Sequence, residues 1–197
     1  MKRIGLFGGS FDPVHLAHVA LARTALDQLA LDEVRWIPAG RQWQKVRALT
    51  PATHRAAMVQ LAIADEPRFT LDRCEIDRSG ASYTYDTVRD LQAAAPGNTW
   101  VLIIGQDQYA GLHTWLQWQK LLQRVTVAVA NRPGAAPQAS PEVAAVPHEA
   151  VALPMMDISS TDIRARVAAG HSVDALVPPA VARYIDLNHL YRGTPGS

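Results

Sequence analysis

Strand-like apolar runs alternate along this chain with segments whose apolar residues have helical spacing, and no other feature limits its fold as strongly. Short apolar segments that are partly β-branched are typical of strands buried on both faces of a sheet. Such segments lie at residues 3–7, 34–38, 100–104 and 125–130. Apolar residues at helical spacing predict helices over residues 16–30, 50–65, 84–95 and 115–123. The order of these segments predicts an α/β fold with a doubly wound, mostly parallel sheet.

Proline, glycine and capping residues refine this layout. Thr50 is placed to cap the second predicted helix, with Pro51 as its first helical residue. Residues 131–149 are rich in Pro and Ala, which favours a surface excursion, and the chain from about residue 158 onward is predicted to be helical. No internal repeat is visible, so we expect residues 1–197 to form a single domain.

Composition excludes several classes of protein. Cys74 is the only cysteine, which rules out a disulfide framework or a thiolate zinc site and fits a reducing, cytoplasmic compartment. The N-terminus lacks the pattern of a signal peptide, and no apolar run approaches the ~20 residues that span a bilayer. A formal net charge of +1 argues against a general polyanion binder such as a nucleic-acid-binding protein.

The stretch "GGSFDPVHLAH", residues 8–18, joins the first predicted strand to the first predicted helix. Gly8 and Gly9 allow backbone amides to approach an anion and permit positive φ, while the helix start offers unpaired N–H groups and the positive end of its dipole. These features predict a phosphate site. The glycine spacing does not match the GxGxxG dinucleotide motif, and no Walker sequence is present.

His15 and His18 stand three residues apart at this helix start, so both face the same side. Taken alone, the pair is more often one capping residue and one surface residue than a ligand site. A zinc site would need a third ligand, and none stands at a suitable spacing. A phosphate ligand would use both rings as N–H donors.

Two motifs, one of them the stretch at residues 8–18, carry a resemblance to a known family. "GGSFDPVHLAH" is similar to the nucleotidyltransferase superfamily motif (T/S)-F-D-P-x-H-x-G-H, and "ISSTDIR" at residues 158–164 resembles its C-terminal partner. "SYTYDT" at residues 82–87, "IIGQDQYAGLHTW" at residues 103–115 and an Ile-Pro pair before a basic loop narrow the resemblance. From residue 4 to about residue 192 the chain resembles the bacterial nicotinate-nucleotide adenylyltransferases.

The resemblance implies a Rossmann-like nucleotidyltransferase fold and a reaction. The 5′-phosphate of nicotinate mononucleotide would attack the α-phosphorus of ATP, giving deamido-NAD and pyrophosphate in a step of NAD biosynthesis. Because the phosphate nucleophile is already anionic near pH 7, positioning and charge stabilisation suffice. Mg²⁺ is expected with ATP, and no protein ligand to it is assigned.

The resemblance also assigns roles to residues. The catalytic set is His15, His18 and Arg164. The ATP-binding set is Gly8, Gly9, Ser10, Phe11, Gly105, Asp107, Arg132, Ile158, Ser159 and Ser160. The set for nicotinate mononucleotide is Lys45, Thr84, Tyr85 and Trp115. N–H donors at Thr84 and Tyr85 would accept the acid and oppose the NH₂ of the amide analogue, and Trp115 would stack on the pyridine ring. The spacing of Ser159 and Asp162 also predicts a helix cap.

The chain departs from the family pattern at two places. Ala17 replaces the glycine of H-x-G-H, and "WQK" at residues 43–45 replaces P-H-K while keeping the lysine. Arg55 is predicted to be a surface charge or a support for this loop. The alternatives left open are a related adenylyltransferase that uses nicotinamide mononucleotide or phosphopantetheine, and a non-catalytic nucleotide-binding domain; "SYTYDT" and Trp115 argue against the first. The sequence does not decide the oligomeric state.

Overall fold

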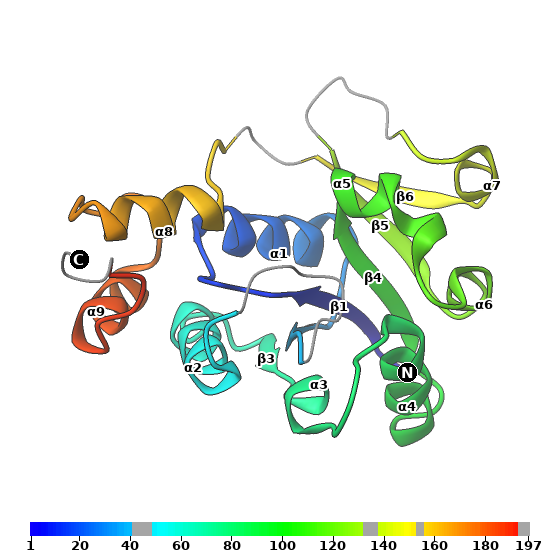
Figure 1. Cartoon of the computed structure of the whole chain (residues 1–197). Coiled ribbons are helices and arrows are strands. Elements are labelled where there is room, and N and C mark those ends of the chain that lie inside the picture. Colours follow the sequence, from blue (N-terminus) through cyan, green and yellow to red (C-terminus); the bar gives the residue numbers. More distant parts are fainter. Residues whose placement is uncertain (41–48, 132–137, 153–155, 193–197) are drawn as a thin grey trace.

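Six parallel strands form one sheet in a computed structural model that describes residues 1–40, 49–131, 138–152 and 156–192 (Figure 1). The strands are β1 (Arg3–Gly9), β2 (Glu33–Pro38), β3 (Phe69–Leu71), β4 (Thr99–Gly105), β5 (Thr126–Asn131) and β6 (His148–Ala152). Their order in the sheet is β3-β2-β1-β4-β5-β6, and each neighbouring pair is parallel. The predicted α/β fold with a doubly wound parallel sheet is confirmed.

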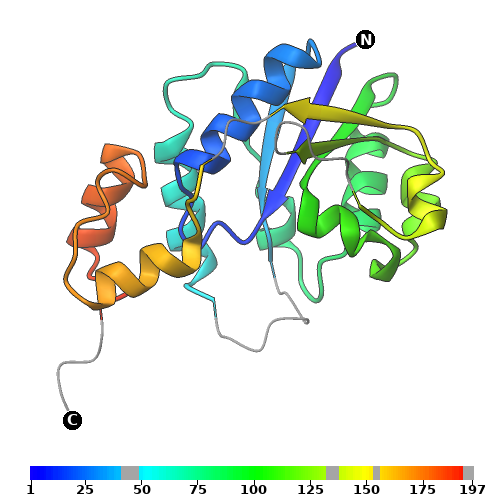
Figure 2. The same cartoon turned by 90° about the horizontal axis from the view of Figure 1, so that it is seen from above.

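Helices cover both faces of this sheet (Figure 2). They are α1 (Leu16–Gln28), α2 (Ala52–Ala62), α3 (Cys74–Asp77), α4 (Thr84–Ala94), α5 (Gln106–Ala110), the 3₁₀ helix η1 (Leu112–Thr114), α6 (Trp118–Leu122), α7 (Pro141–Ala144), α8 (Ser160–Ala168) and α9 (Pro179–Leu187). Within the described ranges, no helix has the length and apolar character that crossing a membrane requires.

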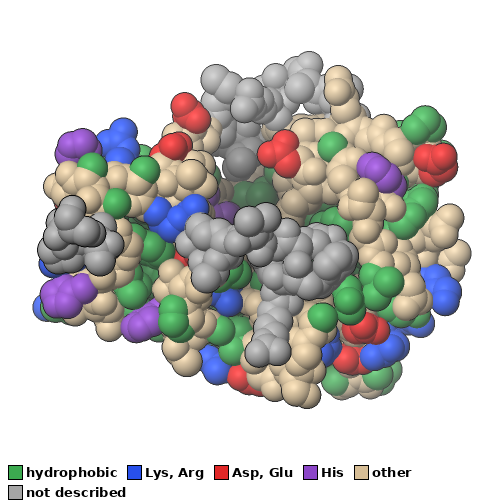
Figure 3. Space-filling model, in the orientation of Figure 1, with side chains coloured by type: hydrophobic (Ala, Val, Ile, Leu, Met, Phe, Trp, Pro, Cys, Tyr) green, Lys and Arg blue, Asp and Glu red, His purple; other side chains and the backbone are tan. Residues whose placement is uncertain are grey.

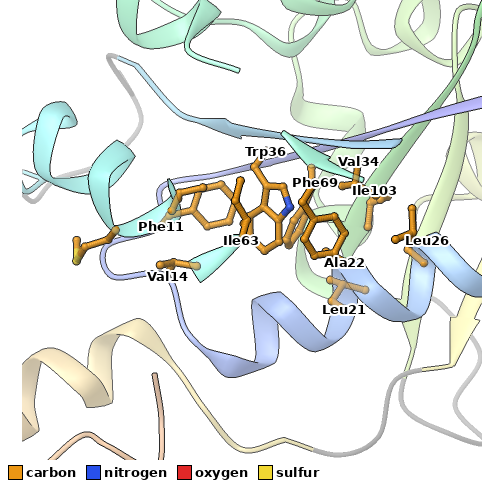
Figure 4. Packing of buried hydrophobic residues seen from close by; sticks show 14 of the residues in the cluster. Phe11, Val14, Leu21, Ala22, Leu26, Val34, Trp36, Ile63, Phe69 and Ile103 are labelled. Atoms are coloured by element: carbon orange, nitrogen blue, oxygen red, sulfur yellow. The ribbon is translucent and has the colours of Figure 1, made fainter. Parts of the chain in front are cut away.

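The alternation of side chains along each strand divides the core into two layers. On β4, Val101 and Ile103 pack with α1, α2, α8 and α9, whereas Leu102 and Ile104 pack with α4, α5, α6 and α7. In the first layer Trp36 is fully buried beside the rings of Phe11 and Phe69 (Figure 4). Its ring centroid lies 4.9 Å from that of Phe7. Burial on both faces explains why the central strands are continuous apolar runs.

Residues 138–149, the described continuation of the predicted surface excursion, lie mostly at the surface but also contain two regular elements. Among the described residues of this range, α7 packs Val143 into the second layer, and β6 begins at His148 and pairs with β5. β6 is an edge strand with one fully buried side chain, Val151, so its sequence lacks the apolar run of a central strand. β3, with only three residues, was missed for the same reason.

Two predicted helices begin later than expected. α2 starts at Ala52, with Pro51 as its N-cap rather than its first residue, so the prediction for Thr50 was wrong by one position. α6 starts at Trp118 instead of residue 115, because Gln117 has a left-handed backbone conformation with φ of 53°. The predicted helices at 16–30 and 84–95 correspond closely to α1 and α4, and the helical C-terminal part is confirmed by α8 and α9.

The strand order reverses between β1 and β4, which are adjacent in the sheet. In folds of this type ligands bind at that point, beyond the carboxyl ends of the strands. β1 extends through Gly8 and Gly9, two residues further than predicted, and β4 ends at Gly105. A side chain at Gly105 would meet no atom within 4 Å, so this edge is open to a ligand.

Candidate active site

The loop from Ser10 to His15 connects β1 to α1 and contains an unusual backbone position. Phe11 has a φ of 47°, in the left-handed region that bulky residues rarely adopt, while neither Gly8 nor Gly9 has a positive φ. The predicted use of glycine φ freedom was therefore wrong. Phe11 is 1% exposed as a whole residue and its ring packs against Phe7, so its side chain is not available to a nucleotide.

His15 and His18 form the start of α1. His15 is the N-cap residue, and its backbone N–H donates to Nδ1 of His18 at 3.2 Å. The two rings stack with centroids 3.6 Å apart. The helix begins at Leu16, as predicted, and the two histidines share one side, as their spacing predicts.

Both imidazoles are neutral at neutral pH. Burial lowers the pKa of His15 to about 4. Burial lowers the pKa of His18 well below its ordinary value, and the neighbouring His15 lowers it further. Because Nδ1 of His18 accepts a hydrogen bond, its ring proton resides on Nε2, which makes Nε2–H a donor.

The second motif docks on this loop, although about 150 residues separate the two in sequence. Nη1 of Arg164 donates to the carbonyl of Asp12 at 2.7 Å, and the Ser160 hydroxyl donates to the carbonyl of Pro13 at 3.0 Å. Ser159 is the N-cap of α8, and its Oγ accepts from the backbone N–H of Asp162 at 3.1 Å, so the predicted cap is confirmed. Ile158 precedes this cap at intermediate exposure.

Asp12 is a buried carboxylate that the sequence analysis did not single out. It is 1% exposed, accepts from the Tyr191 hydroxyl at 2.7 Å and accepts from the backbone N–H of Thr50 at 3.3 Å. Its contacts tie the C-terminal segment and the start of α2 to the β1–α1 loop. Asp12 belongs to the quoted motif, but nothing in the sequence indicates that Tyr191 would reach it.

Arg55 is also buried, at 2% exposure, so the prediction of a surface charge was wrong. Its guanidinium donates to the carbonyl oxygens of Ser10, Ala39 and Thr50 at 2.8, 2.7 and 2.9 Å. Ala39 and Thr50 stand at the two ends of the β2–α2 connection, which confirms the alternative prediction that Arg55 supports this loop. Burial lowers the pKa of Arg55, and the Asp12 carboxylate opposes that shift.

A pocket of about 290 Å³ lies beyond the carboxyl ends of β1 and β4. Of the predicted residues it contains Gly8, Gly9, Thr84 and Trp115 in its wall. Thr84 is the first residue of α4, so backbone N–H groups without helical partners lie at this wall. Tyr85 does not line the pocket. Its ring packs against Arg124, whose guanidinium carbon lies 5.6 Å from the ring centroid, which leaves only the Tyr85 backbone for a ligand.

Glu75 is the acidic residue of the pocket wall, and the sequence analysis missed it. Its carboxylate accepts from the Thr87 hydroxyl at 2.9 Å, and its backbone carbonyl accepts from the Ser82 hydroxyl at 3.3 Å. Burial raises the pKa of Glu75, while hydrogen bonds to its carboxylate and the nearby Arg78 oppose the rise. A side chain at Gly40 would stand 2.1 Å from the Glu75 carbonyl, so only glycine fits this approach.

The remaining predicted residues fall into two groups. Gly105 is the N-cap of α5, and its N–H donates to the Gln108 side chain at 3.2 Å; Asp107 is exposed in the first turn and is not part of the pocket wall. Lys45 and Arg132 lie outside the described residues. Figure 3 shows a hollow in the middle of the molecular face that is turned to the viewer. Histidine side chains (purple) and Lys or Arg side chains (blue) lie at its margin.

Replacing Tyr191 with Phe is expected to lower the free energy of unfolding by about 1.5–3 kcal/mol, because a buried carboxylate loses a hydrogen-bond donor. Urea denaturation measures this. Tyr184→Phe is the matched control, since the Tyr184 hydroxyl pairs with the His54 ring at 2.9 Å rather than with a carboxylate and should contribute only about 0.5–1.5 kcal/mol. Equal losses in the two variants would contradict the role of Tyr191.

No group of three or more His, Cys, Asp or Glu side chains in the described part of the chain is arranged to hold a metal ion. Cys74 is the first residue of α3, and burial raises the pKa of its thiol to about 12.

Comparison with known proteins gives consistent results. A family model described as cytidylyltransferase-like matches residues 6–166. A protein of Methylibium petroleiphilum named "probable nicotinate-nucleotide adenylyltransferase" is 56% identical over 96% of this chain and 92% of its own. One of the same name from Bordetella petrii is 49% identical over 98% of this chain and 100% of its own.

A solved structure shares the fold. Plasmodium falciparum nicotinic acid mononucleotide adenylyltransferase complexed with NaAD superposes with a TM-score of 0.78 and covers 97% of this chain and 98% of its own. The two sequences are 21% identical, so this likeness concerns the fold alone. It confirms the Rossmann-like nucleotidyltransferase fold.

Proposed function

Because the chain belongs to the nicotinate-nucleotide adenylyltransferase family, we propose that it transfers the adenylyl group of ATP to nicotinate mononucleotide. The products are deamido-NAD and pyrophosphate, in a step of NAD biosynthesis. The observation that carries this function is one continuous site, in which Gly8 and Gly9 belong both to the pocket and to the strand that leads into the histidine loop.

The chemistry is an in-line displacement at phosphorus. An oxygen of the mononucleotide 5′-phosphate forms a bond to the α-phosphorus of ATP, and the bond from that phosphorus to the oxygen bridging the β-phosphate breaks, so pyrophosphate leaves with the electron pair. No general base is required, because the nucleophile is ionised near pH 7. His18 and His15 act as neutral donors to the phosphates, and Arg164 supplies positive charge.

The nucleotide is held at the carboxyl ends of β1 and β4. We assign the backbone around Gly9, Ser10 and Phe11 to the triphosphate, and Gly105 with Asp107 to the ribose. Ser159, Ser160 and Ile158 complete the ATP site from the α8 side. Arg132 is assigned to the triphosphate and Lys45 to the mononucleotide phosphate by resemblance only, since both fall outside the described part of the chain.

The pocket under α4 takes the pyridine ring. The free N–H groups of the first turn, at Thr84 and Tyr85, donate to the nicotinate carboxylate, and the Thr84 hydroxyl is a further donor to it. Trp115 at the pocket wall stacks on the ring. The carboxamide of nicotinamide presents an NH₂ group to the same donors, and this mismatch supports selection of the acid.

Three wider assignments accompany this function. Mg²⁺ enters as the ion of the substrate Mg–ATP, whose phosphates and waters provide most of its ligands. Residues 1–197 work as one nucleotidyltransferase unit, since α8 and α9 share the core layer of α1 and α2. The cytoplasmic location, predicted from the single cysteine, stays a prediction.

Pyrophosphate release with ATP and Mg²⁺ tests the function, with nicotinate mononucleotide, nicotinamide mononucleotide and 4′-phosphopantetheine compared at equal concentrations. We expect kcat/KM for the acid to exceed that for the amide by about 10- to 100-fold, the equivalent of one charge-assisted hydrogen bond. Product analysis should give deamido-NAD.

Variants sharpen this test. Thr84→Val should narrow the preference for the acid, whereas Thr53→Val should not, because Thr53 is exposed in the first turn of α2 and is not part of the pocket wall. Equal use of acid and amide by the native protein would refute the selectivity argument. ATP binding without any turnover would favour the non-catalytic alternative.

A further inference from the structure

Arg55 holds three chain segments that meet at the phosphate end of the site. Its Nη1 donates to Ser10, in the β1–α1 loop, and its Nη2 donates to Ala39, just after β2. Its Nε donates to Thr50, just before α2. The side chain is 2% exposed, so bulk water has little access to these bonds. A guanidinium can make all three at once because its donors form a planar fork.

The bond to Ser10 orients the peptide that follows it. In a trans peptide the carbonyl and the N–H point in opposite directions, so the N–H of Phe11 points away from Arg55. Phe11 also has the left-handed φ of 47°, a conformation that persists only where its surroundings enforce it. The Arg55 bond lies directly before that residue and is one of the contacts that enforce it.

The bond to Ala39 orients a second peptide. With the Ala39 carbonyl held by Arg55, the N–H of Gly40 points the other way, toward the Glu75 carboxylate that it contacts in the pocket wall. The Ala39 N–H donates to the Gly9 carbonyl at 2.8 Å. One guanidinium therefore sets the backbone at both the phosphate end and the pyridine end of the site.

We infer that Arg55 is a positioning residue for adenylyl transfer, which fixes the Ser10–Phe11 and Ala39–Gly40 peptides in the arrangement the reaction requires. This inference rests on the proposed function, because it concerns the alignment of ATP with the mononucleotide phosphate. Arg55 itself touches neither substrate. Its contribution is to the geometry of groups that do, and errors of about 1 Å in such geometry cost about 100-fold in rate.

The test compares Arg55→Met and Arg55→Lys with the native protein in the pyrophosphate-release assay. Arg55→Met should lower kcat about 100-fold, with a much smaller change in KM for either substrate. Arg55→Lys keeps the charge but not the fork, so its kcat should lie between those of Arg55→Met and the native protein. Arg183→Met, which removes an exposed arginine of α9, is the matched control and should keep the native kcat.

Rates are measured well below the melting temperature of each variant and are divided by the folded fraction from circular dichroism. A native kcat in folded Arg55→Met would overturn the inference and leave Arg55 with a structural role alone. If Arg55→Met does not fold, Arg55→Lys carries the same comparison, and failure of both to fold would also overturn the inference. An inactive native protein would instead refute the proposed function.

Discussion

Replacing His18 with alanine is expected to lower kcat about 10³-fold, at the upper end of what one phosphate-facing donor contributes. The neutral imidazole has its proton on Nε2, because Nδ1 is occupied by the backbone N–H of His15. In the proposed reaction this Nε2–H meets charge that develops on the phosphates, and removal of one such donor costs roughly 10²–10³ in rate. Steady-state kinetics with saturating ATP and nicotinate mononucleotide measure the effect.

Two further substitutions separate the donor from the helix cap. His18→Asn keeps an acceptor at the position of Nδ1 and loses the reach of Nε2, so it should retain stability and lose nearly as much activity as alanine. His18→Gln keeps a donor near the position of Nε2 and gives up the cap acceptor, so it should retain more activity and less stability. The reverse ranking would show that His18 acts only through the cap of α1.

The central strands and the two motifs were predictable because their physical signals are local. β1, β2, β4 and β5 are buried on both faces and stand out as apolar runs. The edge strands β3 and β6 were not predictable, since one side of each lacks a strand partner in the described sheet and their sequences lack such runs. The glycines at positions 8 and 9 line the pocket, although the positive φ falls on Phe11.

The burial of Asp12 and of Arg55 could not be predicted from the sequence, because their partners come from distant segments. Asp12 accepts a hydrogen bond from the Tyr191 hydroxyl, and Arg55 donates hydrogen bonds to backbone carbonyls of three separate segments. A charged residue in a helix is normally exposed, so nothing near Arg55 in sequence distinguishes it from a surface arginine. Thr84 and Tyr85 were both assigned to the mononucleotide site through the motif SYTYDT. Of these two residues, Thr84 alone lines the pocket.

Acidification from about pH 6.5 to about pH 4 is expected to remove about 3 kcal/mol of stability through His15. Burial lowers the pKa of His15 in the folded protein to about 4, whereas the unfolded chain keeps a pKa of about 6.5. Between these values the unfolded state binds more protons, so the contribution is fully present above about pH 6.5 and is lost as the pH falls toward 4. The size follows from the gap between the folded and unfolded pKa values, because a tenfold change in proton affinity is worth about 1.4 kcal/mol.

Other groups also titrate in this range, so the effect of His15 is measured as the difference between variants in how the free energy of unfolding changes with pH. His15→Asn removes the imidazole and leaves a residue that caps helices well, and its free energy of unfolding should fall less on acidification than that of the native protein. His113→Asn, which replaces an exposed histidine of η1, should reproduce the native pH dependence. Urea denaturation at half-unit pH steps measures all three proteins. Parallel curves for His15→Asn and the native protein would mean that His15 is protonated in the folded state as readily as in the unfolded chain. That result would also contradict the proposed role of His15 as a neutral N–H donor to the phosphates.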